Sequence, residues 1–176
     1  MPSDVDGIRA TIRDVPNFPR PGITFKDITP LLLDAPLFRR AVELMTEPFR
    51  GVGASRVISI ESRGFLLGAP IAIALEAGLV PIRKPGKLPL VRDRVEYALE
   101  YGVDALEMHS DAVGPADRVI IVDDVLATGG TAAGAARLVR GRGAAVVGFT
   151  FLIELDFLKG REKLEGERVE ALLHYS

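Results

Sequence analysis

Apolar and polar residues follow two periods along this chain, one typical of strands and one typical of helices. Short apolar runs predict strands at residues 56–61, 79–83, 118–122 and 144–153, with a candidate edge strand at 169–175. Helical spacing or longer apolar segments predict helices at residues 5–14, 37–49, 65–77, 130–140 and 155–164. Because strands that alternate with helices favour a parallel sheet flanked by helices, the pattern predicts an α/β fold.

Proline interrupts this pattern between residues 15 and 36. The segment carries Pro16, Pro19, Pro21, Pro30 and Pro36, which exclude a long helix or a central strand. It is also rich in apolar residues and therefore has to pack against another part of the protein. Two interpretations stay open: an arm that covers the core, or a lid that contributes to a ligand pocket.

A second irregular region, residues 86–109, predicts a β-hairpin. Val95, Tyr97 and Leu99 alternate with polar residues, and Tyr101-Gly102 is a plausible turn. Residues 88–98 carry several charges, so we expect this hairpin to be flexible and to close over a site, excluding water.

Composition narrows the classes of function. Of the 176 residues, 48% are hydrophobic and 26% are charged, which is typical of a globular protein. We expect one domain over residues 1–176, in which residues 1–36 form an N-terminal helix and arm. A net charge of -2 disfavours a nucleic-acid partner, and the absence of cysteine excludes disulfides and thiolate chemistry. Without a signal-like start or an apolar run of membrane-spanning length, we expect a cytoplasmic protein with no membrane partner.

The segment from Val119 to Thr131 carries the clearest chemistry. A strand predicted to be buried on both faces runs directly into Asp123 and Asp124, and adjacent buried carboxylates are costly unless something uses them. The glycine-rich turn Ala127-Thr128-Gly129-Gly130-Thr131 then opens a helix, where backbone amides and the helix dipole favour an anion. The lysine of a P-loop is absent. We expect a cradle for a phosphate beside a carboxylate pair that accepts from ribose hydroxyls.

In a parallel α/β sheet, ligands bind at the carboxyl ends of the strands. That rule selects residues 61–64 and 83–87 beside the acidic segment. Arg63 can hold phosphate oxygens, with an ordinary solvated turn as the alternative. For Lys84 and Lys87 alone, surface lysines are the better interpretation.

The 13 residues VIIVDDVLATGGT closely resemble the phosphoribosyl pyrophosphate motif of type I phosphoribosyltransferases. Five other segments, in the same order along the chain, are similar to adenine phosphoribosyltransferases: FPRPGITFKDITPLL, ESRGFLLGAP, IRKPGKLP, LEYG and LKGREKL. The resemblance implies the type I phosphoribosyltransferase fold, with residues 1–36 as a hood arm and residues 86–109 as a flexible loop. It also implies a homodimer, with residues 63–65 and the following helix near the interface.

The reaction implied by the resemblance moves phosphoribosyl from phosphoribosyl pyrophosphate to N9 of adenine, giving AMP and pyrophosphate. The residues implied for the ribose and 5′-phosphate are Asp123, Asp124, Ala127, Thr128, Gly129, Gly130 and Thr131. Those implied for pyrophosphate are Ser62, Arg63, Lys84, Lys87 and Tyr101, and those for adenine are Ile23, Phe25, Lys26 and Leu155. Mg²⁺ is expected to be held mainly by the substrate, with Asp123 or Asp124 contributing, one of them through water.

Glu100 is the acid/base that the resemblance implies, although sequence alone favours an ordinary glutamate at a hairpin tip. Two other functions are alternatives to adenine phosphoribosyl transfer. A xanthine or hypoxanthine-guanine enzyme would use a lysine in a later strand, where residues 149–156 offer only Glu154 and Asp156. A non-catalytic phosphoribosyl pyrophosphate sensor would need a DNA-binding module, for which the segment before the arm is too short.

Overall fold

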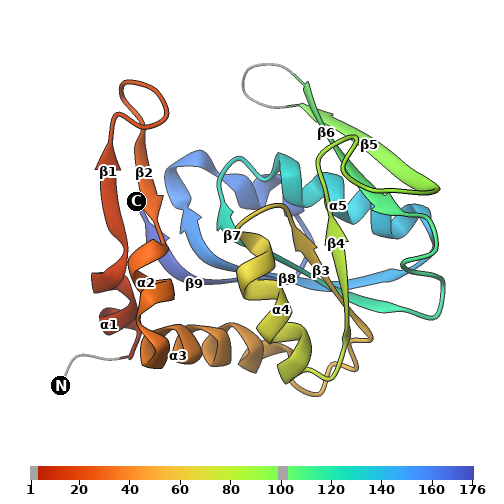
Figure 1. Cartoon of the computed structure of the whole chain (residues 1–176), viewed down its shortest axis with the longest axis horizontal. Coiled ribbons are helices and arrows are strands. Elements are labelled where there is room, and N and C mark those ends of the chain that lie inside the picture. The colour runs from red at the N-terminus through yellow and green to blue at the C-terminus, as the bar shows by residue number, and fades with distance from the viewer. Residues whose placement is uncertain (1–3, 99–102) are drawn as a thin grey trace. The chain divides into compact units, whose positions relative to one another are not determined.

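The computed structural model describes residues 4–98 and 103–176 (Figure 1). The chain divides into two compact units, Met1–Leu44 and Met45–Ser176. Among the helices of the described residues, none is both long and apolar enough to cross a membrane.

A five-stranded parallel sheet is the centre of the larger unit. Its strand order is β4-β3-β7-β8-β9, and every neighbouring pair is parallel. The strands are β3 (Arg56–Ile60), β4 (Gly78–Ile82), β7 (Arg118–Leu126), β8 (Ala145–Leu155) and β9 (Val169–Tyr175). The predicted parallel sheet is confirmed, and residues 169–175 form its edge strand as expected.

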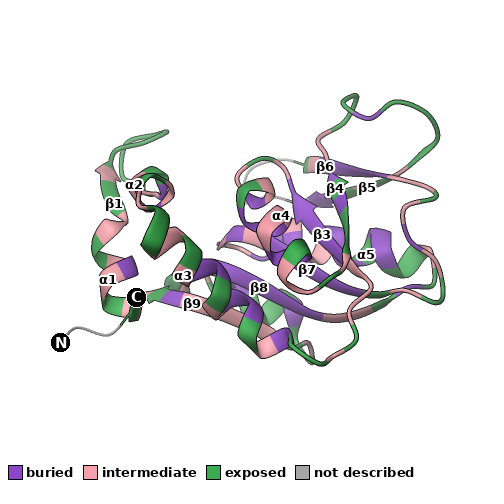
Figure 2. Cartoon of the chain, turned by 60° about the horizontal axis from the view of Figure 1, so that its bottom comes forward, coloured by how far each residue is buried: buried purple, intermediate pink, exposed green. Residues whose placement is uncertain are grey.

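Helices cover both faces of this sheet. Helix α5 (Gly130–Gly141) packs into the same apolar cluster as Ile58 and Ile60. Helix α4 (Gly64–Ala74) lies on the other face, because its Gly68 is in contact with Ser59, and successive strand residues point to opposite faces. The strands between them are largely buried (Figure 2), which explains the continuous apolar runs of the sequence.

An antiparallel hairpin follows β4. Strands β5 (Arg92–Ala98) and β6 (Val103–His109) pair over their whole length. A bridge between Arg83 and Glu107 joins the hairpin to the residue after β4, and the hairpin packs on α5 through Tyr97 and Gly134. The hairpin is confirmed, while the predicted Tyr101-Gly102 turn lies outside the described residues.

The smaller unit holds a two-stranded ribbon and three helices. Helix α1 (Asp4–Thr11) is followed by β1 (Arg13–Pro16), which pairs with β2 (Thr24–Asp27); α2 (Thr29–Leu33) and α3 (Ala35–Thr46) complete the unit and lead into the larger one. Phe18 and Phe25 meet edge to face, with ring centroids 5.2 Å apart. The proline-rich segment is thus neither a long helix nor a central strand, as predicted.

Several predicted elements were wrong in extent or type, and among them the helix predicted at 65–77 ends at Ala74. The first helix ends at Thr11 and not at Asp14, because residues 13–16 pair with β2. Strand β7 does not end at Val122 but continues through Asp123 and Asp124 to Leu126. Its backbone pairs with β8 over these residues, and this pairing does not depend on whether the side chains are polar. The predicted helix at 155–164 is instead two short 3₁₀ segments, η2 (Asp156–Leu158) and η3 (Gly160–Leu164); a further one, η1 (Glu47–Phe49), extends α3.

Candidate active site

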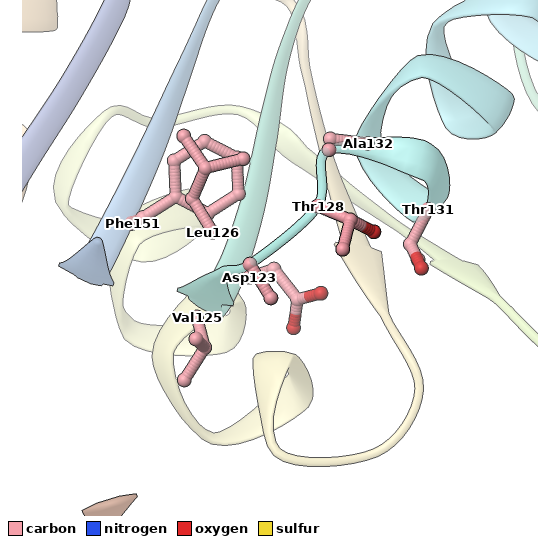
Figure 3. A pocket seen from close by; sticks show the side chains of 9 residues that line it. Asp123, Val125, Leu126, Thr128, Thr131, Ala132 and Phe151 are labelled. Carbon is pink, nitrogen blue, oxygen red and sulfur yellow. The ribbon is translucent and has the colours of Figure 1, made fainter. Parts of the chain in front are cut away.

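The carboxyl end of β7 and the start of α5 enclose a small cavity. Its lining residues are Asp123, Val125, Leu126, Ala127, Thr128, Gly129, Thr131, Ala132 and Phe151. In Figure 3 the side chains of Asp123, Thr128 and Thr131 gather on one side of the strand end, and Leu126 and Phe151 lie together apart from them. The structure therefore brings most of the predicted ribose and phosphate residues into one place.

The loop before α5 is shaped by two glycines. Gly129 precedes the helix with φ +77°, a left-handed conformation that favours glycine. A Cβ on Gly129 would overlap the carbonyl oxygen of Gly160, and a Cβ on Gly160 would overlap that of Ala127. No side chain caps the helix start, so its first amides are available to an anion.

The two carboxylates of β7 differ in their surroundings. Asp124 is 5% exposed, and its Oδ2 lies 2.7 Å from Nε of Arg63 in an ion pair. Asp123 retains some exposure, yet burial of its carboxyl group and the neighbouring charge of Asp124 raise its pKa well above the ordinary value. The Asp124 amide donates to Asp123 Oδ1 over 2.9 Å. One half-buried cation, Arg63, thus lies beside a pair of acids.

Helix α4 begins directly against this pair. A Cβ on Gly64 would stand 2.8 Å from Asp123 Oδ1 and 3.2 Å from the Val122 carbonyl oxygen. Glycine at this position lets a helix N-terminus, which favours negative charge, approach the carboxylate. Arg63 is the N-cap residue of the same helix, and Ser62 is exposed on the preceding turn. The residue predicted to bind pyrophosphate, Arg63, is therefore paired with Asp124, and its pyrophosphate role stays a prediction.

The basic residues after β4 are held by carboxylates. Lys87 forms an ion pair with Glu61, which also accepts from the Lys84 amide over 2.8 Å and from Arg83 Nε over 3.0 Å. Although burial opposes it, these bonds lower the Glu61 pKa to about 2. Lys84 Nζ forms an ion pair with Asp104. Lys87 is nonetheless exposed on the surface, and a pyrophosphate role for either lysine stays a prediction.

Sequence reasoning missed three residues of this region: Glu61, Tyr97 and Asp104. The sequence predicts Glu61 only as the end of a strand. Tyr97 and Asp104 are directly opposite each other in the hairpin register, a relation that depends on where the hairpin turns. Glu100 and Tyr101 themselves lie outside the described residues.

The residues predicted to bind adenine belong to both units. In the smaller unit, Ile23 is exposed, Phe25 packs on Phe18, and Lys26 forms an ion pair with Asp14 at 2.6 Å. In the larger unit, Leu155 ends β8 and is half-buried. That these residues share one pocket stays a prediction.

Comparison with known proteins accords with this geometry. Residues 53–169 match the family model described as the phosphoribosyl transferase domain. An adenine phosphoribosyltransferase of Myxococcus xanthus (strain DK1622) is 57% identical over 171 residues, which is 97% of this chain and 93% of that protein.

Solved structures of adenine phosphoribosyltransferases are also similar to this chain. The crystal structure of adenine phosphoribosyltransferase from Thermoanaerobacter pseudethanolicus ATCC 33223 has a TM-score of 0.95 at 48% identity, covering 97% of this chain and 99% of that chain. The Saccharomyces cerevisiae enzyme, complexed with an imino-altritol bisphosphate and adenine, has a TM-score of 0.91 at 40% identity, covering 97% and 98%.

The chain therefore belongs to the phosphoribosyltransferase family. Within that family it stands among the adenine phosphoribosyltransferases, to which its relatives at 50–57% identity belong.

Proposed function

We propose that this chain transfers the 5-phosphoribosyl group from phosphoribosyl pyrophosphate to N9 of adenine, giving AMP and pyrophosphate in purine salvage. The observation that carries the proposal is the cavity that joins Asp123 to the uncapped helix start at Gly129–Thr131, with Asp124 next to Asp123 on β7. The acids accept from the ribose hydroxyls, and the loop amides receive the 5′-phosphate. Near-full-length identity to adenine enzymes supports the choice of base.

During transfer the bond from C1 of the ribose to pyrophosphate breaks and a bond from C1 to adenine N9 forms, while N9 loses its proton. Positive charge develops at C1, and negative charge develops on the leaving group. The cations proposed for that group are Arg63, Lys84 and Lys87, with Ser62 and Tyr101 as further contacts, because positive groups beside the developing charge stabilise the transition state.

Mg²⁺ fits the acidic pair. Magnesium prefers hard oxygen ligands and retains waters, and here two adjacent carboxylates are balanced by Arg63 alone among the ion pairs of the described residues. Asp123 would contribute an oxygen directly or through water. The bound ion would neutralise pyrophosphate and ribose oxygens.

Adenine recognition is proposed for Ile23, Phe25, Lys26 and Leu155, with Phe25 stacking on the purine. Because the Lys26 ammonium is paired with Asp14, its backbone suits the 6-amino group better than its side chain does. Glu100 takes the role of acid/base.

A homodimer in the cytoplasm completes the proposal. Leu66 and Ile73 lie one heptad apart on α4 and are 47% and 80% exposed. Exposed apolar side chains on a helix that is apolar on all sides suit burial against a second copy. Light scattering tests this: a monomeric mass at micromolar concentration would contradict it.

A panel of bases tests the activity. The chain is incubated with phosphoribosyl pyrophosphate, Mg²⁺ and adenine, hypoxanthine, guanine, xanthine or uracil, and pyrophosphate release is measured. We expect release with adenine at a rate at least about tenfold above any other base. Preference for a 6-oxopurine would contradict the specificity, and no release with any base would favour a sensor.

A further inference from the structure

A buried tyrosine of the hairpin stands between the two phosphate-binding regions. Tyr97 is 5% exposed. Its ring lies on α5, where a Cβ at Gly134 would be 3.2 Å from Cδ1. The ammonium of Lys84 is 5.6 Å from the ring centroid. The packing fixes where the phenol oxygen lies.

The hydroxyl of Tyr97 uses its whole hydrogen-bonding capacity. It donates to Asp104 Oδ2 over 3.0 Å, and it accepts from Lys84 Nζ over 3.0 Å and from Thr131 Oγ1 over 3.3 Å. A phenol has one hydrogen and two lone pairs, so all three are used. A buried group with this many polar partners fixes their positions relative to one another.

These partners come from three separate segments. Lys84 follows β4 on the pyrophosphate side, Thr131 lies in the first turn of α5 on the 5′-phosphate side, and Asp104 faces Tyr97 across the hairpin. Lys84 donates two of its three N–H groups to Tyr97 and Asp104, so one N–H group remains for an oxyanion. The Thr131 hydroxyl hydrogen is directed at Tyr97, so its backbone amide is the group left for a phosphate.

We propose that Tyr97 is a positioning residue that sets Lys84 and Thr131 at the separation that phosphoribosyl pyrophosphate requires, with Asp104 orienting the phenol. The proposal rests on the proposed function. Although burial opposes it, the bonds from Asp104 and Tyr97 raise the Lys84 pKa, and those from Lys84 and Tyr97 keep the pKa of Asp104 low. The network therefore stays charged at neutral pH.

Tyr97→Phe tests the proposal, because it keeps the ring on Gly134 and removes only the hydroxyl. We expect KM for phosphoribosyl pyrophosphate to rise about tenfold to a hundredfold, the loss expected for hydrogen bonds to charged groups. KM for adenine should stay within about twofold. Direct calorimetric titration with phosphoribosyl pyrophosphate, without adenine, should show the same loss of affinity.

Ser110→Ala is the matched control. Like Tyr97, Ser110 has a hydroxyl that donates to an aspartate of the hairpin, in this case to Asp93 Oδ1 over 3.1 Å. It should leave both KM values unchanged.

Equal affinity of wild type and Tyr97→Phe for phosphoribosyl pyrophosphate would overturn the proposal, as would an equal rise in both KM values. If Tyr97→Phe does not fold, Asp104→Ala takes its place with the same two outcomes. A wild-type chain that binds phosphoribosyl pyrophosphate but releases no pyrophosphate with adenine contradicts the proposed function and leaves the affinity test valid.

Discussion

The backbones of Gly129 and Gly160 touch so closely that a Cβ on Gly129 would overlap the carbonyl oxygen of Gly160. Gly129 precedes the helix whose start lines the cavity at Asp123, and Gly160 begins the 3₁₀ segment η3. The shape of the loop before α5 thus depends on a residue about thirty positions away, because the two segments leave no space for side chains.

Gly160→Ala should therefore disturb the loop. Forcing a methyl group into close-packed backbone costs about 1–3 kcal/mol, and we expect KM for phosphoribosyl pyrophosphate to rise about tenfold. Gly141→Ala is the control, because nothing lies within 4 Å of a Cβ there, and it should change neither KM nor stability. Steady-state kinetics and thermal melts of both variants check this; a Gly160→Ala enzyme with unchanged KM would disprove the dependence.

Asp124→Asn should weaken the binding of phosphoribosyl pyrophosphate. The variant breaks the 2.7 Å ion pair with Arg63 and removes an acceptor for a ribose hydroxyl, so a loss of about 1.5–3 kcal/mol is expected. Calorimetric titration measures it, with the exposed Asp111→Asn as the control for loss of charge. Unaltered affinity would refute the ribose assignment.

Glu61 should make stability depend on pH in the acid range. Its pKa is lowered from 4.5 to about 2 in the folded chain, so its stabilising effect is complete above about pH 4.5 and is lost as the pH falls towards 2. Glu61→Gln should reduce the free energy of unfolding at pH 7 by about 1–2 kcal/mol, after allowing for solvent screening of Lys87. Urea titrations should show the difference shrinking between pH 4.5 and 2; a constant difference would contradict the ion pair.

Glu100→Gln should lower turnover about tenfold or more while changing the affinity for adenine by less than about threefold, because an acid/base acts on the proton of N9. Glu96→Gln, on an exposed position of the same hairpin, is the control. Single-turnover measurements separate chemistry from product release. Turnover equal to wild type would remove Glu100 from this role.

The sequence predicted the sheet well, because the strands of a parallel α/β core are continuous apolar runs, as in residues 118–122. It also predicted the cavity at Asp123 and Gly129, since strand ends and glycine turns are local features. It could not predict the contact of Gly160 with Gly129, nor the meeting of Lys84 with Asp104, because both arise from tertiary packing.

The same limit explains the error at residues 155–164. Helical spacing predicts a helix over these residues. In the structure, however, Glu154 forms an ion pair with Arg161, and Asp156 accepts from His174 at 3.0 Å. The chain turns in short 3₁₀ segments that bring Gly160 against the loop before α5.

The central claim is transfer of phosphoribosyl to adenine at the Asp123–Thr131 site. Its most direct test is to quantify, by chromatography, the AMP and the pyrophosphate formed from adenine and phosphoribosyl pyrophosphate in one reaction. We expect one AMP for every pyrophosphate, with the formation of both products reduced together in Asp124→Asn. Pyrophosphate released without AMP would contradict it.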